Sequence, residues 1–572
     1  MKPTVTTGAH AMWESLLCEG ADVVFGYPGG ATLPIYDALV DYPQIRHVLV
    51  RHEANAVFAA DGYARATGRV GVCLATSGPG ATNLITGLAN AMADSSPVVA
   101  IVGQVASNLV GGDAFQETDI TGITLPITKH NYLITRADQI APAIKEAFHI
   151  ARSGRPGPVL LDICKDAQIA TTDFAYPTEV RLPGRRPRQA SVAELVDRAA
   201  VLINNARQPV IVAGHGIVIA NAYEELRQLA ETAEIPVVTT LLGIGTLPES
   251  HRLNLGMAGM HGHAWANQAV QSADLLIALG MRFDDRFTGN LKHFAPHADV
   301  IHVDIDPAEI GKNVPAKVGI VGDVRHVLQV LLPRISPNSH SDWLRRIADW
   351  HRDALDIDIL HVNALGDLLL APYVVNEIWR ETGGNVLIVT DVGQHQMWAA
   401  QYFRYDRPNQ FITSGGLGAM GFSFGAAMGA KLGQPAEEVW VVVGDGGLQM
   451  CSMELATMVQ EGLDIKIAVM RNGYLGMVRQ WQELMYNRRY SATPITGPNL
   501  SKLAEAYGIL GLSAETKTDV VPAIRQARQH RGPVLIDFRV EAEVNVFPMV
   551  QPGKALHDMM RRPRTEMVFA GK

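Results

Sequence analysis

The sequence contains little cysteine, with Cys18, Cys73, Cys164 and Cys451 as the only four among 572 residues. No two of them have the C-x-x-C spacing of a zinc site or a redox pair, so the sequence indicates neither. Cys73 lies in an apolar run, where a buried free thiol is the simpler interpretation. We therefore expect a protein of a reducing compartment.

Long apolar segments and an excess of positive charge are also absent. No run of about 18 apolar residues occurs, and residues 1–20 contain no apolar signal core. The 49 basic residues stand against 57 acidic ones, which gives a net charge of −8. This balance offers no electrostatic basis for binding nucleic acid or for a polybasic membrane anchor. We expect a soluble, cytoplasmic protein that binds neither nucleic acid nor a membrane.

The dominant pattern is an alternation of short apolar segments with helical stretches, which is typical of α/β folds with parallel sheets. The length suggests about three domains. We predict domains at 1–175, 192–335 and 372–550, a linker rich in Pro and Arg at 176–191, and a polar tail at 551–572. Strands are predicted within 22–28, 47–53, 70–78, 98–104, 157–163, 208–216, 235–240, 273–286, 300–307, 385–393, 410–416, 439–447, 465–473 and 532–540.

Two polar side chains follow two successive apolar segments of the third block. Asp445, between glycines, comes directly after VWVVV, and Asn472 comes after IKIAVM. Ligands of open α/β sheets bind beyond the carboxyl ends of the strands, and neighbouring strands lie about 4.8 Å apart. The two side chains supply a charge of −1, which is too little for a tight all-protein Ca²⁺ site but suits Mg²⁺ completed by phosphate and water. A lone G-D-G is usually only a turn; the pairing with Asn472 is what favours a metal and diphosphate site.

A second pattern offers a competing interpretation. Residues 416–421 match G-x-G-x-x-G between a strand-like and a helix-like stretch, and Asp445 follows later in the chain. This is the pattern of a dinucleotide-binding fold. The match is weak. In a nicotinamide site the acidic residue ends the second strand, and no second metal-binding side chain follows it. Asp445, by contrast, is flanked by glycines and paired with Asn472.

Glu53 is the candidate of the first block. It follows the apolar segment 47–50 and opens a helical stretch. A glutamate in a first helical turn commonly does no more than complement the helix dipole. The turn TSGPGATN at 76–83 is a second glycine-rich turn after a predicted strand.

Taken together, these segments resemble those of thiamine diphosphate enzymes, and the resemblance extends over nearly the whole chain in the order pyrimidine, central and diphosphate domain. It implies bound thiamine diphosphate and Mg²⁺. Glu53 matches the glutamate that bonds N1′ of the aminopyrimidine and so promotes loss of the proton from thiazolium C2. Met420 matches the apolar side chain that bends the cofactor. The family implies that Glu53 and the metal site come from different subunits, so the smallest active unit is a dimer.

The same resemblance assigns the metal to Asp445, Asn472 and the backbone oxygen of Tyr474. It assigns cofactor contacts to a larger set, rich in glycine, besides Glu53 and Met420: Gly29, Pro79, Asn83, Gly393, Gln394, His395, Gly418, Gly446, Gly447 and Met477.

Finer motifs resemble the FAD-containing acetohydroxyacid synthases, the biosynthetic acetolactate synthase catalytic subunits. These motifs are GDAFQETD, SGRPGPVLLDI, GMAGMHG, RFDDR and GMVRQWQ. The resemblance places Gln116 near the reacting centre and Arg286 on the carboxylate of the second ketoacid, a role that suits a planar guanidinium. It places Phe115, Lys165, Met260 and Trp481 along the substrate channel, with Trp481 favouring 2-oxobutyrate over pyruvate as acceptor.

A structural FAD is implied by the resemblance alone, since no G-x-G-x-x-G precedes a helix in the second block. The matching positions are Arg155, Gly214, His261, Arg282, Asp304 and Asp323.

The expected reaction condenses two pyruvates to 2-acetolactate with loss of CO₂, or pyruvate with 2-oxobutyrate to 2-aceto-2-hydroxybutyrate, in branched-chain amino acid biosynthesis. A homodimer or homotetramer and a small regulatory subunit are the partners that the family implies. Three alternatives remain. The first is another thiamine enzyme, pyruvate oxidase or a catabolic acetolactate synthase, which the motifs GMVRQWQ and RFDDR disfavour. The others are a non-catalytic relative and a nicotinamide-dependent dehydrogenase.

Three positions depart from the family pattern. Arg471 replaces the first of two adjacent asparagines, Cys164 replaces a proline beside Lys165, and Ala106 replaces a proline near the channel mouth. Loss of the rigid turn at Cys164 could displace Lys165. None of the three changes touches Glu53 or Asp445.

Overall fold

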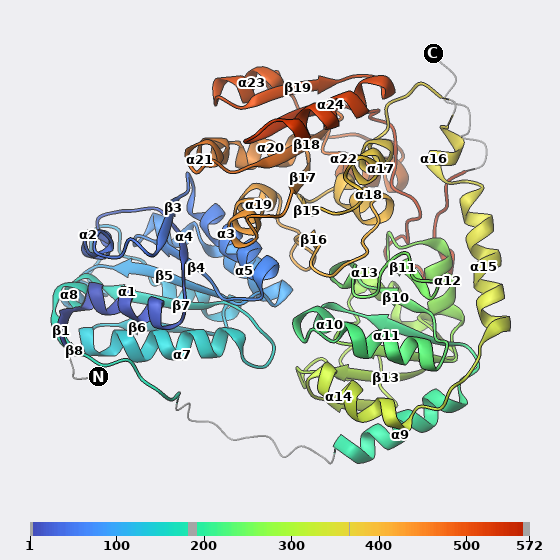
Figure 1. Cartoon of the computed structure of the whole chain (residues 1–572), viewed down its shortest axis with the longest axis horizontal. Coiled ribbons are helices and arrows are strands. Elements are labelled where there is room, and N and C mark those ends of the chain that lie inside the picture. The colour runs from blue at the N-terminus through green and yellow to red at the C-terminus, as the bar shows by residue number, and fades with distance from the viewer. Residues whose placement is uncertain (1–3, 181–191, 365, 564–572) are drawn as a thin grey trace.

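The computed structural model describes residues 4–180, 192–364 and 366–563. These residues form three α/β blocks, each built on a parallel six-stranded sheet (Figure 1). The predicted fold class is therefore confirmed. Every segment in which we predicted a strand contains one. Most of the predicted linker, residues 181–191, lies outside the described residues.

The first sheet lies in the N-terminal block and pairs its strands in the order β3-β2-β4-β5-β7-β6, all parallel. Helices α1 (Gly8–Cys18) and α7 (Ile140–Arg152) share a core with one face, and α3 (Glu53–Thr67) and α5 (Ile85–Asp94) with the other. The strands are β2 (Val23–Gly26), β3 (Arg46–Leu49), β4 (Gly71–Ala75), β5 (Val98–Gln104), β6 (His130–Ile134) and β7 (Val159–Cys164). A short antiparallel pair, β1 (Thr4–Thr7) and β8 (Thr171–Phe174), lies beside it.

The second sheet has the order β11-β10-β9-β12-β13-β14. Helices α9 (Val192–Asn205), α11 (Tyr223–Thr232) and α14 (Val324–Leu331) pack on one face, and α12 (Ala264–Ser272) packs on the other. The strands are β9 (Pro209–Ala213), β10 (Val237–Thr239), β11 (Asn254–Met257), β12 (Leu275–Leu279), β13 (Asp299–Asp304) and β14 (Val318–Val321).

The third sheet has the order β16-β15-β17-β18-β20-β19. Its strands are apolar on both faces because α19 (Phe422–Gly433) covers one face, while α17 (Ala371–Thr382), α18 (Gln394–Tyr402) and α24 (Lys517–Gln529) cover the other. The strands are β15 (Leu387–Thr390), β16 (Phe411–Ile412), β17 (Val439–Gly444), β18 (Ile465–Arg471), β19 (Leu510–Ala514) and β20 (Val534–Arg539).

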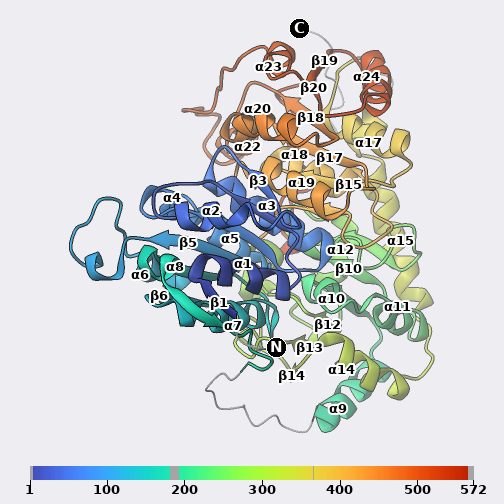
Figure 2. The ribbon, with the colours of Figure 1, turned by 60° about the vertical axis from the view of Figure 1, so that its left-hand side comes forward.

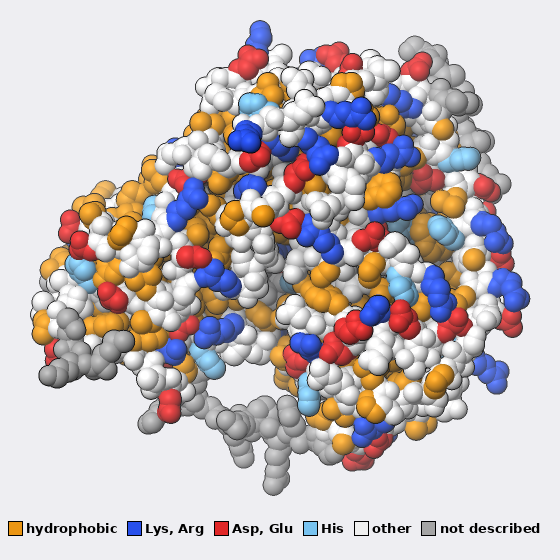
Figure 3. Space-filling model, in the orientation of Figure 1, with side chains coloured by type: hydrophobic (Ala, Val, Ile, Leu, Met, Phe, Trp, Pro, Cys, Tyr) orange, Lys and Arg blue, Asp and Glu red, His pale blue; other side chains and the backbone are white. Residues whose placement is uncertain are grey.

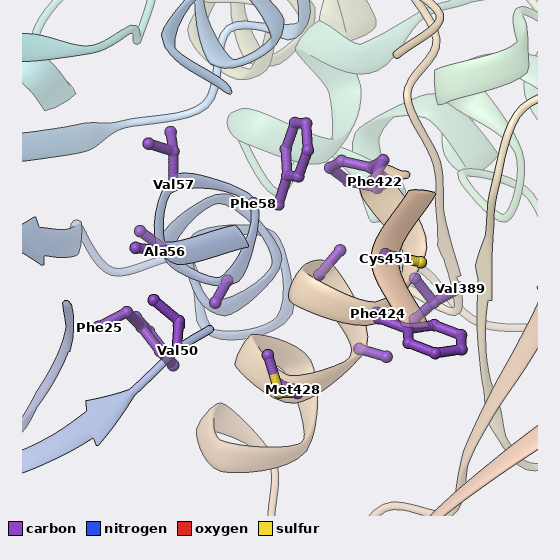
Figure 4. Packing of buried hydrophobic residues seen from close by; sticks show 14 of the residues in the cluster. Phe25, Val50, Ala56, Val57, Phe58, Val389, Phe422, Phe424, Met428 and Cys451 are labelled. Carbon is purple, nitrogen blue, oxygen red and sulfur yellow. The ribbon is translucent and has the colours of Figure 1, made fainter. Parts of the chain in front are cut away.

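The first and third sheets share one continuous hydrophobic core, and helices α3 and α19 pack against each other inside it. Small residues let the two backbones approach. A Cβ on Gly429 would lie 1.8 Å from the carbonyl oxygen of Ala59, so only glycine is accommodated there. Phe58 of α3 meets Phe422 of α19 edge to face, with ring centroids 5.4 Å apart (Figure 4). The two blocks that carry the predicted thiamine motifs are thus one packed unit.

A buried ionic junction also joins the blocks. Arg65 of α3 pairs with Asp61 at 2.6 Å and with Asp94 at 2.8 Å, and its guanidinium is almost inaccessible to water. The Asp94 carboxylate also accepts the backbone N–H groups of Gly415 and Gly416 from the third block. Since both carboxylates and the guanidinium have partners, the charges are buried without being left unpaired.

Helix α15 (Ser341–Leu355) runs along one side of the molecule between the second and third blocks (Figure 2). The described part of the tail returns to the second block, where Asn290 binds Lys554 and Gly553. Basic and acidic side chains are interspersed on the surface shown in Figure 3. Among the described residues there is no helix that could span a membrane.

Candidate active site

The carboxyl ends of β17 and β18 bring Asp445 and Asn472 together. The two strands are paired in parallel, with Gly444 opposite Met470, so the next residues of both strands emerge at the same edge. Asp445 opens helix α20 (Asp445–Cys451) rather than lying in a loop. Both side chains line one cavity of about 60 Å³, together with Tyr474. We call it the metal cavity, because all three predicted metal ligands surround it.

Hydrogen bonds orient the two oxygen donors. One oxygen of the Asp445 carboxylate accepts the backbone N–H of Gly473 at 2.8 Å, and the amide oxygen of Asn472 accepts the N–H of Tyr474 at 3.0 Å. Burial raises the pKa of the Asp445 carboxyl to about 6, against the hydrogen bond from Gly473. A carboxylate shielded from water in this way gains from a cation at its remaining oxygen. No group of three His, Cys, Asp or Glu residues within the described residues could hold a metal, so a cation here needs further oxygen from elsewhere.

Neutral polar groups also line the metal cavity. Gln394 and His395, at the start of α18, line it with Gly446 and Gly447. Burial lowers the pKa of His395 to about 4, so the imidazole is uncharged at neutral pH. Its Nε2 atom is buried and has no hydrogen-bond partner among the described residues. A cavity with an unpaired imidazole nitrogen and glycine walls suits a phosphate group that accepts a hydrogen bond.

Glu53 lies in a separate group in the N-terminal block. It is the first residue of α3, and its carboxylate accepts the side-chain N–H of Asn83 at 2.9 Å. Pro79 opens the short helix α4 (Pro79–Thr82) beside it, and a Cβ on Gly80 would lie 3.3 Å from the carboxylate. A Cβ on Gly29 would meet Thr76 of the same turn at 2.5 Å. The structure therefore brings Gly29, Glu53, Pro79 and Asn83 together; we call them the glutamate cluster.

Gln116 lies next to the glutamate cluster, because a Cβ on Gly78 would come within 2.7 Å of its carbonyl oxygen. Gln116 has a φ of +61°, a left-handed conformation that is uncommon outside glycine. Its neighbour Phe115 is 88% exposed. Glu53, Gln116 and Lys165 line neither the metal cavity nor the larger cavity described next. Within one chain, the predicted proton relay therefore lies outside the cavity of the predicted metal ligands.

The larger cavity, of about 990 Å³, lies where the three blocks meet. Arg155, from the first block, hydrogen-bonds Ser95 and pairs with Asp306 and Glu309 of the second block. His261 has a buried Nδ1 atom without a partner among the described residues, and burial lowers its pKa to about 4. Five of the six predicted flavin positions line this cavity: Arg155, His261, Arg282, Asp304 and Asp323.

Gly214 is the sixth flavin position and does not line the cavity, although His215 and Gly216 do. A Cβ on Gly214 would lie 2.3 Å from the carbonyl oxygen of Gly280, so close strand packing already requires glycine there. The structure gives this residue a packing role.

The two cavities adjoin, since Gly393, Met420 and Met477 line both. Gly418 lines the larger cavity only. The substrate positions Arg286 and Trp481 face each other at the larger cavity, with the guanidinium carbon 5.7 Å from the indole centroid. Arg286 also contacts the sulfur of Met260 at 3.4 Å. The Arg286 guanidinium thus contacts the side chains of both Trp481 and Met260. Met420, which is predicted to bend the cofactor, lines the same cavity.

Three regions of the chain match the thiamine pyrophosphate enzymes: the N-terminal TPP binding domain at 6–123, the central domain at 196–331 and the C-terminal TPP binding domain at 391–538. An acetolactate synthase of Mycobacterium bovis is 53% identical over 557 residues, which cover 96% of this chain and 90% of the relative. The chain belongs to the acetolactate synthase family of thiamine pyrophosphate enzymes. The large subunit of Corynebacterium glutamicum is 49% identical over 97% of this chain and 90% of its own length. That of Porphyra purpurea is 44% identical over 97% of this chain and 95% of its own.

Two departures from the acetolactate synthase family pattern occur where the backbone could accommodate a proline. Cys164 has φ −60° and Ala106 has φ −58°, close to the value that a proline ring imposes. The residue before Lys165 therefore has a φ that proline could also adopt. The third departure, Arg471, pairs at 3.0 Å with Asp537, whose side chain is buried. Because of this ion pair, the Arg471 side chain points toward the neighbouring strand β20. Asn472, the next residue, lines the metal cavity.

The alternative of a dinucleotide site at 416–421 is wrong. In such a site the N-terminus of the following helix binds the pyrophosphate. Here the N–H of Gly421 at 3.0 Å and the N–H and hydroxyl of Ser423 at 3.2 and 2.8 Å donate to the buried carboxylate of Asp391. The amides that a pyrophosphate would need already have an anionic partner.

Sequence reasoning missed Asp391, which positions the turn that carries Gly418 and Met420. It directly follows β15, as Asp445 follows β17, so the rule that found Asp445 could have found it. Glu454, which binds the backbone ahead of Glu53, was also missed. No local pattern points to Glu454, because its partners lie about 400 residues earlier in the chain.

Proposed function

We propose that this protein condenses two molecules of pyruvate to 2-acetolactate with loss of CO₂, and pyruvate with 2-oxobutyrate to 2-aceto-2-hydroxybutyrate, in branched-chain amino acid biosynthesis. The observation that carries the proposal is the metal cavity, which Asp445, Asn472, His395 and Met420 line together. Relatives named as acetolactate synthases along almost the whole chain support the choice of reaction.

Mg²⁺ would be held by Asp445, Asn472 and the backbone oxygen of Tyr474, with diphosphate oxygens completing its shell. His395 would bind the same diphosphate through its unpartnered Nε2 atom. The Gln394 side chain would line the site without donating to it, because its NH₂ group already donates to Gln480 and to the carbonyl oxygen of Val544. Bound thiamine diphosphate supplies an electron sink for the carbon that loses CO₂. Glu53 would hold and move the proton at N1′, and Gln116 would lie near the reacting atoms. Arg286 would bind the carboxylate of the second ketoacid, since a guanidinium can form two parallel hydrogen bonds with it.

FAD would occupy the larger cavity. The unpaired Nδ1 atom of the buried His261 and the cationic groups of Arg155 and Arg282 suit a ligand with phosphates and polar rings. Its role would be structural, because the net reaction transfers no electrons.

The active enzyme would be a cytoplasmic homodimer or homotetramer, with or without a small regulatory subunit. The separation of the glutamate cluster from both cavities supports this assembly. A second chain would bring its Glu53, Gln116 and Lys165 to the cavities of the first.

The test is acetolactate formation from pyruvate with thiamine diphosphate and Mg²⁺, with and without FAD. We expect product only when FAD is added or retained. Acetolactate from protein shown to be free of flavin would refute the flavin proposal while leaving the carboligation intact. Reduction of a bound flavin during turnover, without acetolactate, would favour an oxidase instead.

Replacement of Trp481 by leucine is expected to lower the preference for 2-oxobutyrate over pyruvate by roughly 10-fold, because the contact with one extra methylene is worth about 1–3 kcal/mol. The preference is measured as the ratio of the two products when both acceptors compete. Trp379→Leu is the control, since Trp379 lies on α17 and lines neither cavity. An unchanged ratio in Trp481→Leu would remove Trp481 from the acceptor site.

A further inference from the structure

Glu454 is a fully buried carboxylate that reaches from the third block to the first. It ends the short helix η7 (Ser452–Glu454), and its relative exposure is 0%. One carboxylate oxygen accepts the backbone N–H of Arg51 at 2.9 Å and that of His52 at 3.1 Å. These are the two residues that directly precede Glu53. A side chain of the third block thus binds the backbone directly before Glu53, the predicted proton relay.

The second oxygen of Glu454 is held within its own block. It accepts the hydroxyl of Thr457 at 2.6 Å, in α21 (Leu455–Gln460). Burial raises the pKa of the Glu454 carboxyl, while the hydrogen bonds from Thr457, Arg51 and His52 oppose that rise. With one oxygen anchored to α21 and the other on two consecutive amides, the carboxylate joins two rigid elements.

We propose that Glu454 is a positioning residue that sets where helix α3 presents Glu53. The inference rests on the proposed role of Glu53 as proton relay. Helix α3 begins at Glu53, so the amides of Arg51 and His52 lie just outside it and have no partner in the helix itself. Two amides bound to one oxygen restrict the direction in which the chain enters the helix. A displacement of reacting groups by about 1 Å costs about 100-fold in rate.

The same segment also starts at the metal cavity. Helix α20 begins at Asp445 and ends at Cys451, and η7 follows without a break. Glu454 therefore places Glu53 relative to the segment that begins with a predicted metal ligand, although Glu53 itself does not line the metal cavity of its own chain. Within one chain, Glu454 thus connects the backbone before Glu53 to the segment that begins at Asp445; in the proposed dimer these two residues would serve different active sites.

The first experiment uses the full-length protein without cofactors. Hydrogen–deuterium exchange is followed by mass spectrometry in peptides that cover residues 47–56. We expect Glu454→Ala to raise the exchange rate of two amides in this segment at least 10-fold, and Glu454→Gln to leave it unchanged. The glutamine keeps an oxygen for the amides, and its NH₂ can donate to Thr457, whose hydroxyl already lies 3.4 Å from the carbonyl oxygen of Leu49. Gln460→Ala is the matched control, because among the described residues the Gln460 side chain hydrogen-bonds the guanidinium of Arg51 and not the backbone of this segment.

The second experiment measures the exchange of the C2 proton of bound thiamine diphosphate by NMR, with no substrate present. We expect Glu454→Ala to slow this exchange about 100-fold, and kcat to fall with it. Glu454→Gln and Gln460→Ala should stay within about 3-fold of the native protein, with cofactor affinity unchanged in all three. Because no pyruvate is used, a native protein that exchanges the proton but makes no acetolactate would refute the proposed reaction and not this proposal.

Native exchange rates in Glu454→Ala would overturn the proposal. So would an equal slowing of C2-proton exchange in Glu454→Gln and Glu454→Ala, because it would mean that the charge of Glu454 matters and not its hydrogen bonds. If Glu454→Ala does not fold, Glu454→Asp replaces it, since its carboxylate ends about 1.5 Å short of the two amides. Slowed C2 exchange with faster amide exchange in Glu454→Asp supports the proposal, and native behaviour in both measurements overturns it.

Discussion

Glu53→Gln is expected to slow acetolactate formation by about 1,000-fold, within the range of roughly 100- to 10,000-fold that a positioned acid or base contributes. Glutamine keeps the length of the side chain and an oxygen for the hydrogen bond from Asn83, so helix α3 should keep its start. What is lost is a group that can hold a proton at N1′. The measurement is kcat together with the affinity for thiamine diphosphate, and only kcat should change.

The control for this change is Glu461→Gln, which removes a carboxylate from an ion pair with Arg46 outside both cavities. It should leave kcat within about 2-fold, since such pairs contribute little. If Glu53→Gln retained native turnover, the assignment of the proton relay would be wrong. If cofactor affinity fell together with kcat, Glu53 would serve binding and not proton transfer.

Asp445→Asn is expected to weaken the joint binding of Mg²⁺ and thiamine diphosphate by at least about 100-fold, because even residues behind the ligands of a metal site contribute about 10- to 100-fold. Among the described residues, Asp445 is the only carboxylate that lines the metal cavity. Asparagine can still accept the N–H of Gly473, so the strand ends should stay in place. Binding is measured by titrating the cofactor and the metal separately against intrinsic fluorescence, and activity should return in part at high Mg²⁺.

Asp464→Asn is the matched control. Asp464 precedes β18 at the other end of the same β-α-β unit and pairs with Lys466. It should leave the Mg²⁺ requirement unchanged. Native cofactor binding in Asp445→Asn would mean that the cavity between β17 and β18 is not the metal site.

The site could be predicted in part, because some of its residues follow from local rules. Asp445 and Asn472 stand at the ends of two apolar segments joined by a helix, and parallel pairing alone brings such ends together. Glu53 could be placed at a helix start, but only the family resemblance gave it a role. The six flavin positions had no local signal, and the structure gives one of them, Gly214, a packing role.

The secondary structure, too, could be predicted from the sequence only in part. Strands buried on both faces, such as β17 and β18, were predicted because their apolar runs are continuous. The edge strands β6, β11, β14 and β19 were not predicted, since at least half of their side chains remain partly accessible. The helix start at Asp445 was not predicted, since two glycines follow that residue and glycine is unfavourable within a helix.

The α/β class, a division into about three blocks and the position of Asp445 and Asn472 at two strand ends could be inferred without any structure. These depend on periodicity and on residues close together in the chain. Only the packing of helices and sheets places Asp391 against the N–H of Gly421, Glu454 against the backbone before Glu53, and the glutamate cluster apart from both cavities. The first two contacts join residues about 30 and 400 positions apart, and no local pattern encodes such contacts.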